Sequence, residues 1–413
     1  MTTSTEPRTQ VLLGGEGLRA HEHHEVEDAL RDRGQWVTRA VLPTGVTVAV
    51  VTVGLDEARR LAADQRLSKD GNALEAAYLA QLSRLGLPGM VNPMNAVSAL
   101  NSDDPLHRRL RKPIAAVFTP RRIEALRPRI ERIARGLVDT LPHDVPLDLV
   151  STYATPMSFK VLCELLDLPE SDHAVLVPWT QALTAENPAV TGPAAAAVAE
   201  YLGRLVADRT RHPADDLISD LVRVTDPAEP DSAQWLVNNV LLLIVAGHET
   251  TAGTIGNLLG VLLSPRTAHG WAALAAAPET APLVVEEGSR HNPAVRNLTP
   301  RVARERVEVH GSVIEPGELV FINVGAANRD PAVHGPTAAE FDPFRATARQ
   351  QLTFGHGVHY CVGAQLAPIS AAAAIRELTT RYPRTRRAFT DYWPCRDSSV
   401  TNPPEKILAV LRA

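Results

Sequence analysis

Cysteines and aromatic residues are both scarce in this sequence of 413 residues, and each shortage narrows the class of protein. The three cysteines, Cys163, Cys361 and Cys395, lie far apart and form no CxxC pair, which excludes a disulfide framework and fits a reducing cytoplasm. Phe, Trp and Tyr together make up 4% of the residues while Ala and Leu dominate the apolar set, a composition that favours helix.

Long basic blocks and unbroken apolar runs are missing as well. A net charge of −5 without a basic block argues against nucleic acid as a partner. The polar stretch 1–20 holds neither a signal-peptide core nor a membrane span, so we expect no membrane anchor and a flexible N-terminal segment over residues 1–25. Because no repeat or low-complexity linker divides the chain, residues 1–413 are expected to form one domain.

Apolar spacing predicts a mostly helical chain with two small groups of strands. Residues 35–53 alternate in polarity around a Pro-Thr-Gly turn and predict a β-hairpin, and a second strand group is expected at 307–324. Most of the chain from 55 to 380 has helical spacing, and Pro113 and Pro128 are among the prolines expected to separate the helices. The sheets would therefore be drawn from distant parts of the chain.

The longest apolar helical pattern covers residues 235–263. It contains Asn238, Asn239, His248 and Glu249, which indicate a buried central helix and not a membrane span. We therefore predict an α+β fold that is mostly α.

A lone cysteine lies in the most informative segment, Phe354-Gly-His-Gly-Val-His-Tyr-Cys-Val-Gly363, ahead of a helical pattern over 364–378. Glycines let a backbone approach a flat ligand closely, and amide groups at a helix N-terminus stabilise a thiolate. A thiolate on haem iron promotes O–O cleavage. Taken alone, however, a buried unreactive cysteine is the commoner interpretation.

This segment resembles the haem-binding signature of the cytochrome P-450 family, F-x-x-G-x-H/R-x-C-x-G, at every fixed position. The resemblance implies a triangular-prism fold with a long central helix and small sheets, and haem b (iron protoporphyrin IX) as cofactor. Cys361 would be the axial ligand of the iron. Phe354 would pack beside the sulfur, Gly355 and Gly363 would admit the haem, and His359 would donate to a haem carboxylate.

Further motifs of the family follow in the expected order. Glu287-Gly-Ser-Arg290 matches E-x-x-R, and its spacing puts both side chains on one helical face. In isolation such a pair is usually surface decoration. The resemblance implies that the pair is structural, not catalytic, and is locked by Arg345.

Basic residues match the haem-carboxylate donors of the family. His107 and Arg111 share a helical face, and Arg301 lies in a predicted strand. Such residues would hold the two carboxylates through charge-assisted bonds. Without the cysteine signature, a solvated basic helix would explain the first two equally well.

Ala246-Gly-His-Glu-Thr-Thr251, inside the long helical pattern, resembles the oxygen-activation motif of the family. Gly247 is costly in mid-helix, a cost more often tolerated where a ligand must fit. The resemblance makes Thr250 and Glu249 catalytic: Thr250 would bond dioxygen or an ordered water, and Glu249 would relay protons from solvent. A threonine that bonds its own i−4 carbonyl is the alternative, and it is compatible with this role.

These features together predict a monooxygenase that inserts one oxygen atom from O2 into a mainly apolar organic substrate, as bacterial relatives do when they tailor secondary metabolites. A peroxide- or nitric-oxide-using haem enzyme and a non-catalytic helper protein of the same fold are the alternatives. The expected pocket residues are Met90, Met94, Leu242, Val245, Ala246, Val295, Leu298, Ser398 and Val400.

No flavin or nicotinamide fingerprint is present, so a separate ferredoxin or flavodoxin with its reductase must supply electrons. Such carriers are acidic, and Arg108, Arg109 and Lys112 form a plausible docking face for them.

Overall fold

Helices dominate the computed structural model, which describes residues 13, 20–87, 89, 95–169, 172–184, 188–267, 270–388, 393–396 and 398–413. The α-helices are α1 (Ala20–Asp32), α2 (Leu55–Ala62), α3 (Gly71–Arg84), α4 (Leu106–Val117), α5 (Pro120–Thr140), α6 (Thr155–Leu166), α7 (His173–Thr184), α8 (Pro188–Arg211), α9 (Leu217–Val224), α10 (Ser232–Leu263), α11 (Gly270–Ala276), α12 (Ala281–His291), α13 (Val324–Asn328), α14 (Pro331–His334) and α15 (Leu366–Arg381). The predicted α+β class with a helical majority is confirmed.

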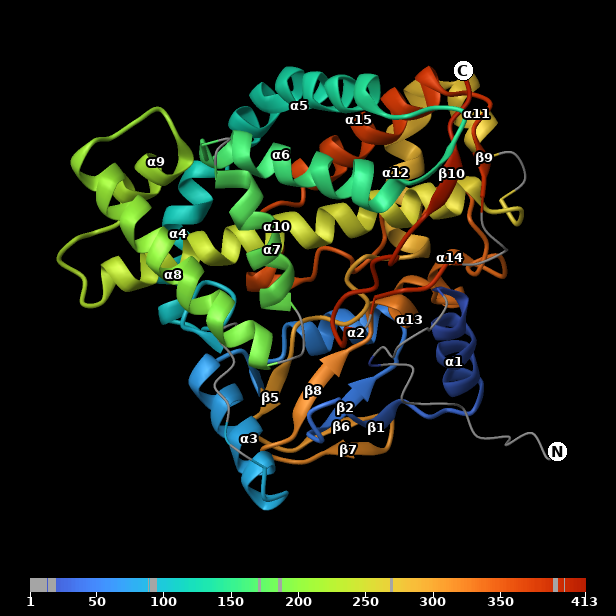
Figure 1. Cartoon of the computed structure of the whole chain (residues 1–413). Helices are drawn as coiled ribbons and strands as arrows, with labels where there is room; N and C mark the ends of the chain where they lie inside the picture. The colour runs from blue at the N-terminus through green and yellow to red at the C-terminus, as the bar shows by residue number, and fades with distance from the viewer. Residues whose placement is uncertain are drawn as a thin grey trace.

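The strands form three small sheets, as Figure 1 shows in part. They are β1 (Val37–Val41), β2 (Thr47–Val51), β3 (Leu67–Ser68), β4 (Pro146–Asp148), β5 (Arg301–Ala303), β6 (Val307–Val309), β7 (Ser312–Ile314), β8 (Leu319–Ile322), β9 (Arg386–Arg387) and β10 (Leu408–Val410). The largest sheet has the order β1-β2-β8-β5-β3, and the others are β4-β10-β9 and β6-β7.

The predicted hairpin at 35–53 is confirmed as antiparallel β1 and β2, with Val37 opposite Val51. Gly45 in its turn has φ +86°, which a residue with a side chain rarely adopts. Strand β2 then pairs in parallel with β8, and β5 pairs with both β8 and β3. The sheet thus brings residues near 68 and near 301 together, although they are far apart in the sequence.

The central helix α10 crosses the helical part of the molecule, with α5, α6 and α15 on one side of it in Figure 1. It has 32 residues and begins three residues before the predicted start. Its last turns are buried almost all round, which explains the near-continuous apolar sequence. No helix in the described ranges is long and apolar enough to cross a membrane.

Small residues on α10 let the C-terminal segment approach it closely. A Cβ atom at Gly260 would lie 2.6 Å from the ring of Trp393, and one at Gly256 would lie 2.7 Å from Pro404. Both separations are too short for a real side chain, so glycine is required at both positions. Trp393, Pro403 and Pro404 therefore lie directly against α10.

Two expectations from the sequence are wrong in part. Residues 20–25, expected to belong to a flexible segment, form the start of α1, because Val26 and Leu30 are buried and Glu27 makes a buried ion pair with Arg296. Pro113 and Pro128 do not separate helices but lie inside α4 and α5. Each helix continues past its proline with one backbone hydrogen bond fewer.

Candidate active site

The loop of Cys361 is a compact turn ahead of α15. Gly355 (φ +73°) donates its N–H to Leu352 O at 2.8 Å, and Gly357 has φ +72°. The N–H of Cys361 then donates to the carbonyl oxygen of Phe354 at 2.9 Å, which closes the loop. The two left-handed glycines are the reason this sequence folds back on itself here. Helix α15 starts at Leu366, two residues after the start of the predicted helical pattern.

Cys361 differs from the other two cysteines of the chain in its access. Cys163 and Cys395 are buried, and burial raises the pKa of each thiol to about 12. Cys361 is exposed. Close packing around it also raises its pKa, but the N–H of Gly363 and the charge of Arg111 oppose that effect. Cys361 is thus an accessible thiol with local support for its thiolate form, as a metal ligand requires.

Helix α4 contacts this loop through His107 and Arg111, the two residues predicted to share one helical face. The Nδ1 atom of His107 lies 2.9 Å from Ala99 O, and its Nε2 atom lies 3.1 Å from Val358 O. Arg111 donates to Tyr360 O. The rings of His107 and His359 are 4.2 Å apart between centroids. Both α4 residues therefore bond to backbone carbonyls around the Cys361 loop.

Arg301 on β5 is 5% exposed, and burial lowers its pKa to about 10. One of its terminal nitrogens donates to Leu67 O at 3.3 Å, but its Nε atom is buried without a hydrogen-bond partner. The Nδ1 atom of His359 is likewise buried and unbonded. Burial, reinforced first by the charge of Lys69, lowers the pKa of His359 to about 2.

Five side chains thus converge beside the Cys361 loop, and we refer to Lys69, His107, Arg111, Arg301 and His359 as the basic cluster. Lys69 was missed by the sequence analysis, because no local pattern marks it. The unbonded nitrogens of Arg301 and His359 are donors that suit an anion. The two carboxylates of haem b fit this donor set, and the accessible sulfur of Cys361 fits its iron.

The predicted oxygen-activation motif, residues 246–251, lies in mid-α10. The hydroxyl of Thr250 donates to Ala246 O at 2.6 Å, which is the i−4 bond that the sequence analysis left as an alternative. Ala246 is exposed, and Thr250 and Leu242 are half-buried on the same face. Ser158 of α6 donates to His248 O at 2.7 Å, so a neighbouring helix holds the backbone of this motif.

Glu249 is 9% exposed, and its cationic neighbour is Arg396 from the C-terminal segment, at 3.4 Å between NH1 and Oε2. Burial raises the pKa of Glu249, and the charge of Arg396 opposes this rise. His248 is fully buried beside it, and burial lowers the pKa of His248 to about 4. Arg396 was not found from the sequence, because it reaches Glu249 only through the packing of the C-terminal segment on α10.

The expected substrate residues fall into separate groups. Met90 and Met94 lie outside the described residues. Val295 pairs with Thr401 in an isolated bridge, and the carbonyl of Val400 accepts from the N–H groups of Arg296 and Asn297, so the segments around Val295–Leu298 and Ser398–Val400 lie together. Val245 is 5% exposed and belongs to the core that α10 shares with α6 and α8, and Leu242 packs against the same core.

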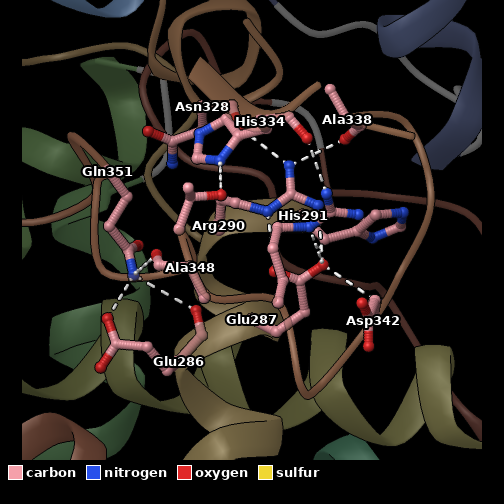
Figure 2. Close-up of polar contacts among 12 residues, drawn as sticks. Glu286, Glu287, Arg290, His291, Asn328, His334, Ala338, Asp342, Ala348 and Gln351 are labelled. Atoms are coloured by element: carbon pink, nitrogen blue, oxygen red, sulfur yellow. Dashed lines mark hydrogen bonds and ion pairs between the residues drawn. The ribbon is translucent and has the colours of Figure 1, made fainter. Parts of the chain in front are cut away.

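The E-x-x-R pair belongs to a separate network of polar contacts, which Figure 2 shows. Arg290 makes two 2.8 Å bonds to Glu287, and it also donates to the carbonyl oxygens of Asn328, Ala338 and Glu340. Arg345 donates to the same carboxylate at 3.2 Å, and the N–H of Asp342 donates to it at 2.9 Å. The three residues predicted to interact are thus in contact. We refer to Glu287, Arg290 and Arg345 as the E-x-x-R cluster.

Known proteins resemble this chain over nearly its full length. The profile of the family described as Cytochrome P-450 matches residues 280–406. Cytochrome P-450 107B1 of Saccharopolyspora erythraea is 34% identical over 94% of this chain and 94% of its own length. Mycinamicin IV hydroxylase/epoxidase of Micromonospora griseorubida is 40% identical over 70% of this chain and 72% of its own length. The solved structure of the tirandamycin C-bound P-450 monooxygenase TamI superposes with a TM-score of 0.83 at 33% identity, and covers 94% of this chain and 97% of that one.

These similarities include the segments of the Cys361 loop, the central helix and the E-x-x-R cluster. The family is a haem-thiolate family that uses protoporphyrin IX. The chain therefore belongs to the cytochrome P-450 family and is a haem-thiolate monooxygenase.

Proposed function

We propose that this monooxygenase hydroxylates or epoxidises a large, mainly apolar secondary metabolite of the polyketide type. Several relatives carry names of this kind, including 6-deoxyerythronolide B hydroxylase of Saccharopolyspora erythraea, at 36% identity over 81% of this chain. On the accessible face of α10, Leu242 and Ala246 offer apolar groups to a substrate, one turn before the hydroxyl of Thr250. A panel of macrolactones, linear polyketides and peptides, scored by the shift of the haem Soret band, tests the substrate class.

The observation that carries the assignment is the accessible sulfur of Cys361 with the N–H of Gly363 directed at it. Cys361→Ser removes the thiolate but keeps a side chain of similar size. We expect the reduced, carbon-monoxide-bound wild type to show the red-shifted Soret band of a thiolate ligand, and the variant to lack it. Cys163→Ser, a change at a buried cysteine, should keep the band. A variant at Cys361 that retained it would disprove the ligand assignment.

The other residues of the site are assigned by their contacts. Haem b, when bound to Cys361, supplies the redox chemistry that activates O2. Phe354 and Gly355 shape the loop beside the sulfur, and Gly363 supports the thiolate. Arg301 and His359 would hold the haem carboxylates with their unbonded nitrogens. His107 and Arg111 would complete that site while holding the Cys361 loop against α4.

Proton delivery is assigned to Thr250 and Glu249. The Thr250 hydroxyl has its hydrogen on Ala246 O, so its oxygen remains free to accept a bond from a water on the accessible face of α10. Glu249 is mostly buried but is tied to the half-exposed Arg396, so its carboxyl group lies between the protein interior and solvent. A carboxyl group with a raised pKa in that position takes up and releases protons near neutral pH more readily than an ordinary one.

Thr250→Ala should separate haem binding from proton delivery. We expect normal haem content and substrate binding, continued NADPH consumption through a surrogate ferredoxin system, and a ratio of product to NADPH lowered roughly 10-fold or more, because positioned proton transfer contributes about 10²–10⁴-fold. The lost reducing equivalents should appear as hydrogen peroxide. Thr254→Ala, one turn further along α10, is the matched control. An unchanged ratio would remove Thr250 from the mechanism, and efficient turnover with added peroxide alone would favour a peroxide-using enzyme.

An acidic ferredoxin or flavodoxin is the proposed electron donor, and the enzyme is proposed to work in the cytoplasm. Lys112 and Arg108 are exposed on α4, beside the exposed Val358 and Tyr360 of the Cys361 loop. Arg108 and Arg109 contribute less than the sequence suggested, because Arg108 pairs with Asp104 at 2.8 Å, and Arg109 pairs with Glu229 and lies over the ring of Trp235. Charge reversal at Lys112 should weaken docking of the donor, and the loss should shrink at high salt.

A further inference from the structure

Lys69 is almost completely buried, which is unusual for a lysine. It lies between β3 and α3 and is 1% exposed. Its Nζ atom donates to the hydroxyl of Thr299 at 2.6 Å and to Pro300 O at 3.3 Å. An ammonium group has three N–H donors, so one remains. A lysine is almost never buried without an anion beside it.

The nearest acid does not supply that anion. Asp103 accepts the backbone N–H of Lys69 at 2.9 Å and the hydroxyl of Ser68, and it also pairs with Arg304 at 3.0 Å. In the described part of the chain, no carboxylate lies within ion-pair distance of the Lys69 ammonium itself. The carboxylate of Asp103 is thus engaged by three other groups, and its charge acts on the Lys69 ammonium only from beyond ion-pair distance.

The position of Lys69 is fixed by the sheet. Ser68 pairs with Val302 across β3 and β5, and the two acceptors of Lys69 are the residues directly before Arg301. Arg301 in turn donates to Leu67 O, so Lys69, directly after β3, lies beside Arg301 on the adjoining strand β5.

We propose that Lys69 is a further haem-binding residue, which donates its third N–H to a haem carboxylate beside Arg301 and His359 and so controls haem retention and reduction potential. The proposal rests on the carboxylate-binding role proposed for those two residues. Burial of an unpaired charge is unfavourable, and one carboxylate beside three such donors relieves it. Burial, and then the charge of Arg301, hold the pKa of Lys69 well below its ordinary value, while the charge of Asp103 opposes this.

Two substitutions separate the charge of Lys69 from its bonds to the backbone. Lys69→Gln keeps N–H donors for Thr299 and Pro300 but removes the charge, whereas Lys69→Arg keeps the charge. Arg39→Gln, at an exposed arginine on β1 of the same sheet, is the control. The readouts are the rate of haem transfer from the holoenzyme to apomyoglobin, the reduction potential, and the bending bands of the haem carboxylates in the resonance Raman spectrum.

We expect Lys69→Gln to lose haem roughly 10-fold faster, which corresponds to about 1.4 kcal/mol. Its reduction potential should become more negative, because a positive charge near the haem favours the reduced state. Its carboxylate bands should shift. Lys69→Arg should restore most of the retention, and Arg39→Gln should behave like wild type.

Wild-type retention and bands in Lys69→Gln would overturn the proposal. Faster haem loss with unchanged bands and potential would also overturn it, because Lys69 would then act only by tying β3 to β5. If Lys69→Gln does not fold, Lys69→Arg decides: retained haem with displaced carboxylate bands, because a guanidinium replaces the ammonium donor, supports the contact, whereas faster haem loss with unchanged bands refutes it. Failure of the underlying function is distinct, since the wild type itself would then lack a haem-thiolate spectrum.

Discussion

The E-x-x-R cluster and the basic cluster both bury charged side chains, but they differ in how those charges are satisfied. In the first, each nitrogen of Arg290 donates to Glu287 or to a backbone carbonyl, and Arg345 shares the same carboxylate. In the second, Arg301 and His359 retain buried nitrogens without partners, and Lys69 lacks a carboxylate. Buried charges that are all paired within the protein stabilise the fold. Buried positive charges without carboxylate partners indicate instead that an anionic ligand binds beside them.

The energetics of the two clusters should differ accordingly. Removing one member of a closed buried pair leaves its partner charged and unpaired, which destabilises the protein strongly. Removing a cation that has no anionic partner in the protein leaves no such charge behind. The stability of the fold and the affinity for haem should therefore respond to different substitutions.

Glu287→Ala should have the largest effect. It leaves Arg290 and Arg345 without their shared carboxylate and should lower the free energy of unfolding by about 3–5 kcal/mol, giving haem-poor or insoluble protein. Glu286→Ala, at the neighbouring residue whose side chain accepts from Gln351 at 2.6 Å, is the matched control and should cost much less. Urea unfolding and the haem-to-protein ratio provide the measurement. A soluble, haem-replete Glu287→Ala protein that had lost only turnover would show that the E-x-x-R cluster is catalytic and does not serve mainly the stability of the fold.

Arg301→Gln should weaken haem binding and leave the stability of the fold unchanged. Loss of hydrogen bonds from a charged donor weakens binding by about 1.5–3 kcal/mol, so haem should dissociate roughly 10- to 100-fold faster. The haem-free protein should unfold at the same urea concentration as haem-free wild type, because no acid is left unpaired within the cluster. Comparing the two unfolding curves with the rate of haem transfer gives the result. A haem-free variant as unstable as Glu287→Ala would show that Arg301 serves the fold.

The features that could be predicted from the sequence are those that local residue patterns mark. The hairpin at 35–53, the long helix and the cysteine segment each depend on residues close together in the chain, and the structure contains all three elements. Lys69 and Arg396 could not be found in this way. Lys69 meets Thr299 across 230 positions and Arg396 meets Glu249 across 147, so only the packing of the sheet and of the C-terminal segment brings them to the site.

The ends of elements depended on packing in the same way. Residues 20–25 are polar and have no apolar stripe of their own, so their helix was not expected. They are helical because the residues that follow them in α1 are buried, including Glu27 in its ion pair with Arg296. The ion pair joins positions 269 apart, and no local pattern reveals it.

The last expected effect appears only in acid and concerns His334, at the edge of the E-x-x-R cluster. His334 is 5% exposed, its Nε2 atom is buried without a partner, and burial together with the charges of Arg290 and Arg345 lowers its pKa to about 4. The unfolded chain has the ordinary value of about 6.5, so between these two pH values the unfolded state binds a proton that the folded state does not. The contribution of His334 to stability is therefore complete above about pH 6.5 and is lost as the pH falls towards 4, by at most about 1.4 kcal/mol per pH unit.

His334→Gln should flatten the decline of the unfolding free energy over this range, whereas His212→Gln, at an exposed histidine, should not. If the unfolding free energy falls equally steeply with pH in wild type and in His334→Gln, a group other than His334 takes up the proton.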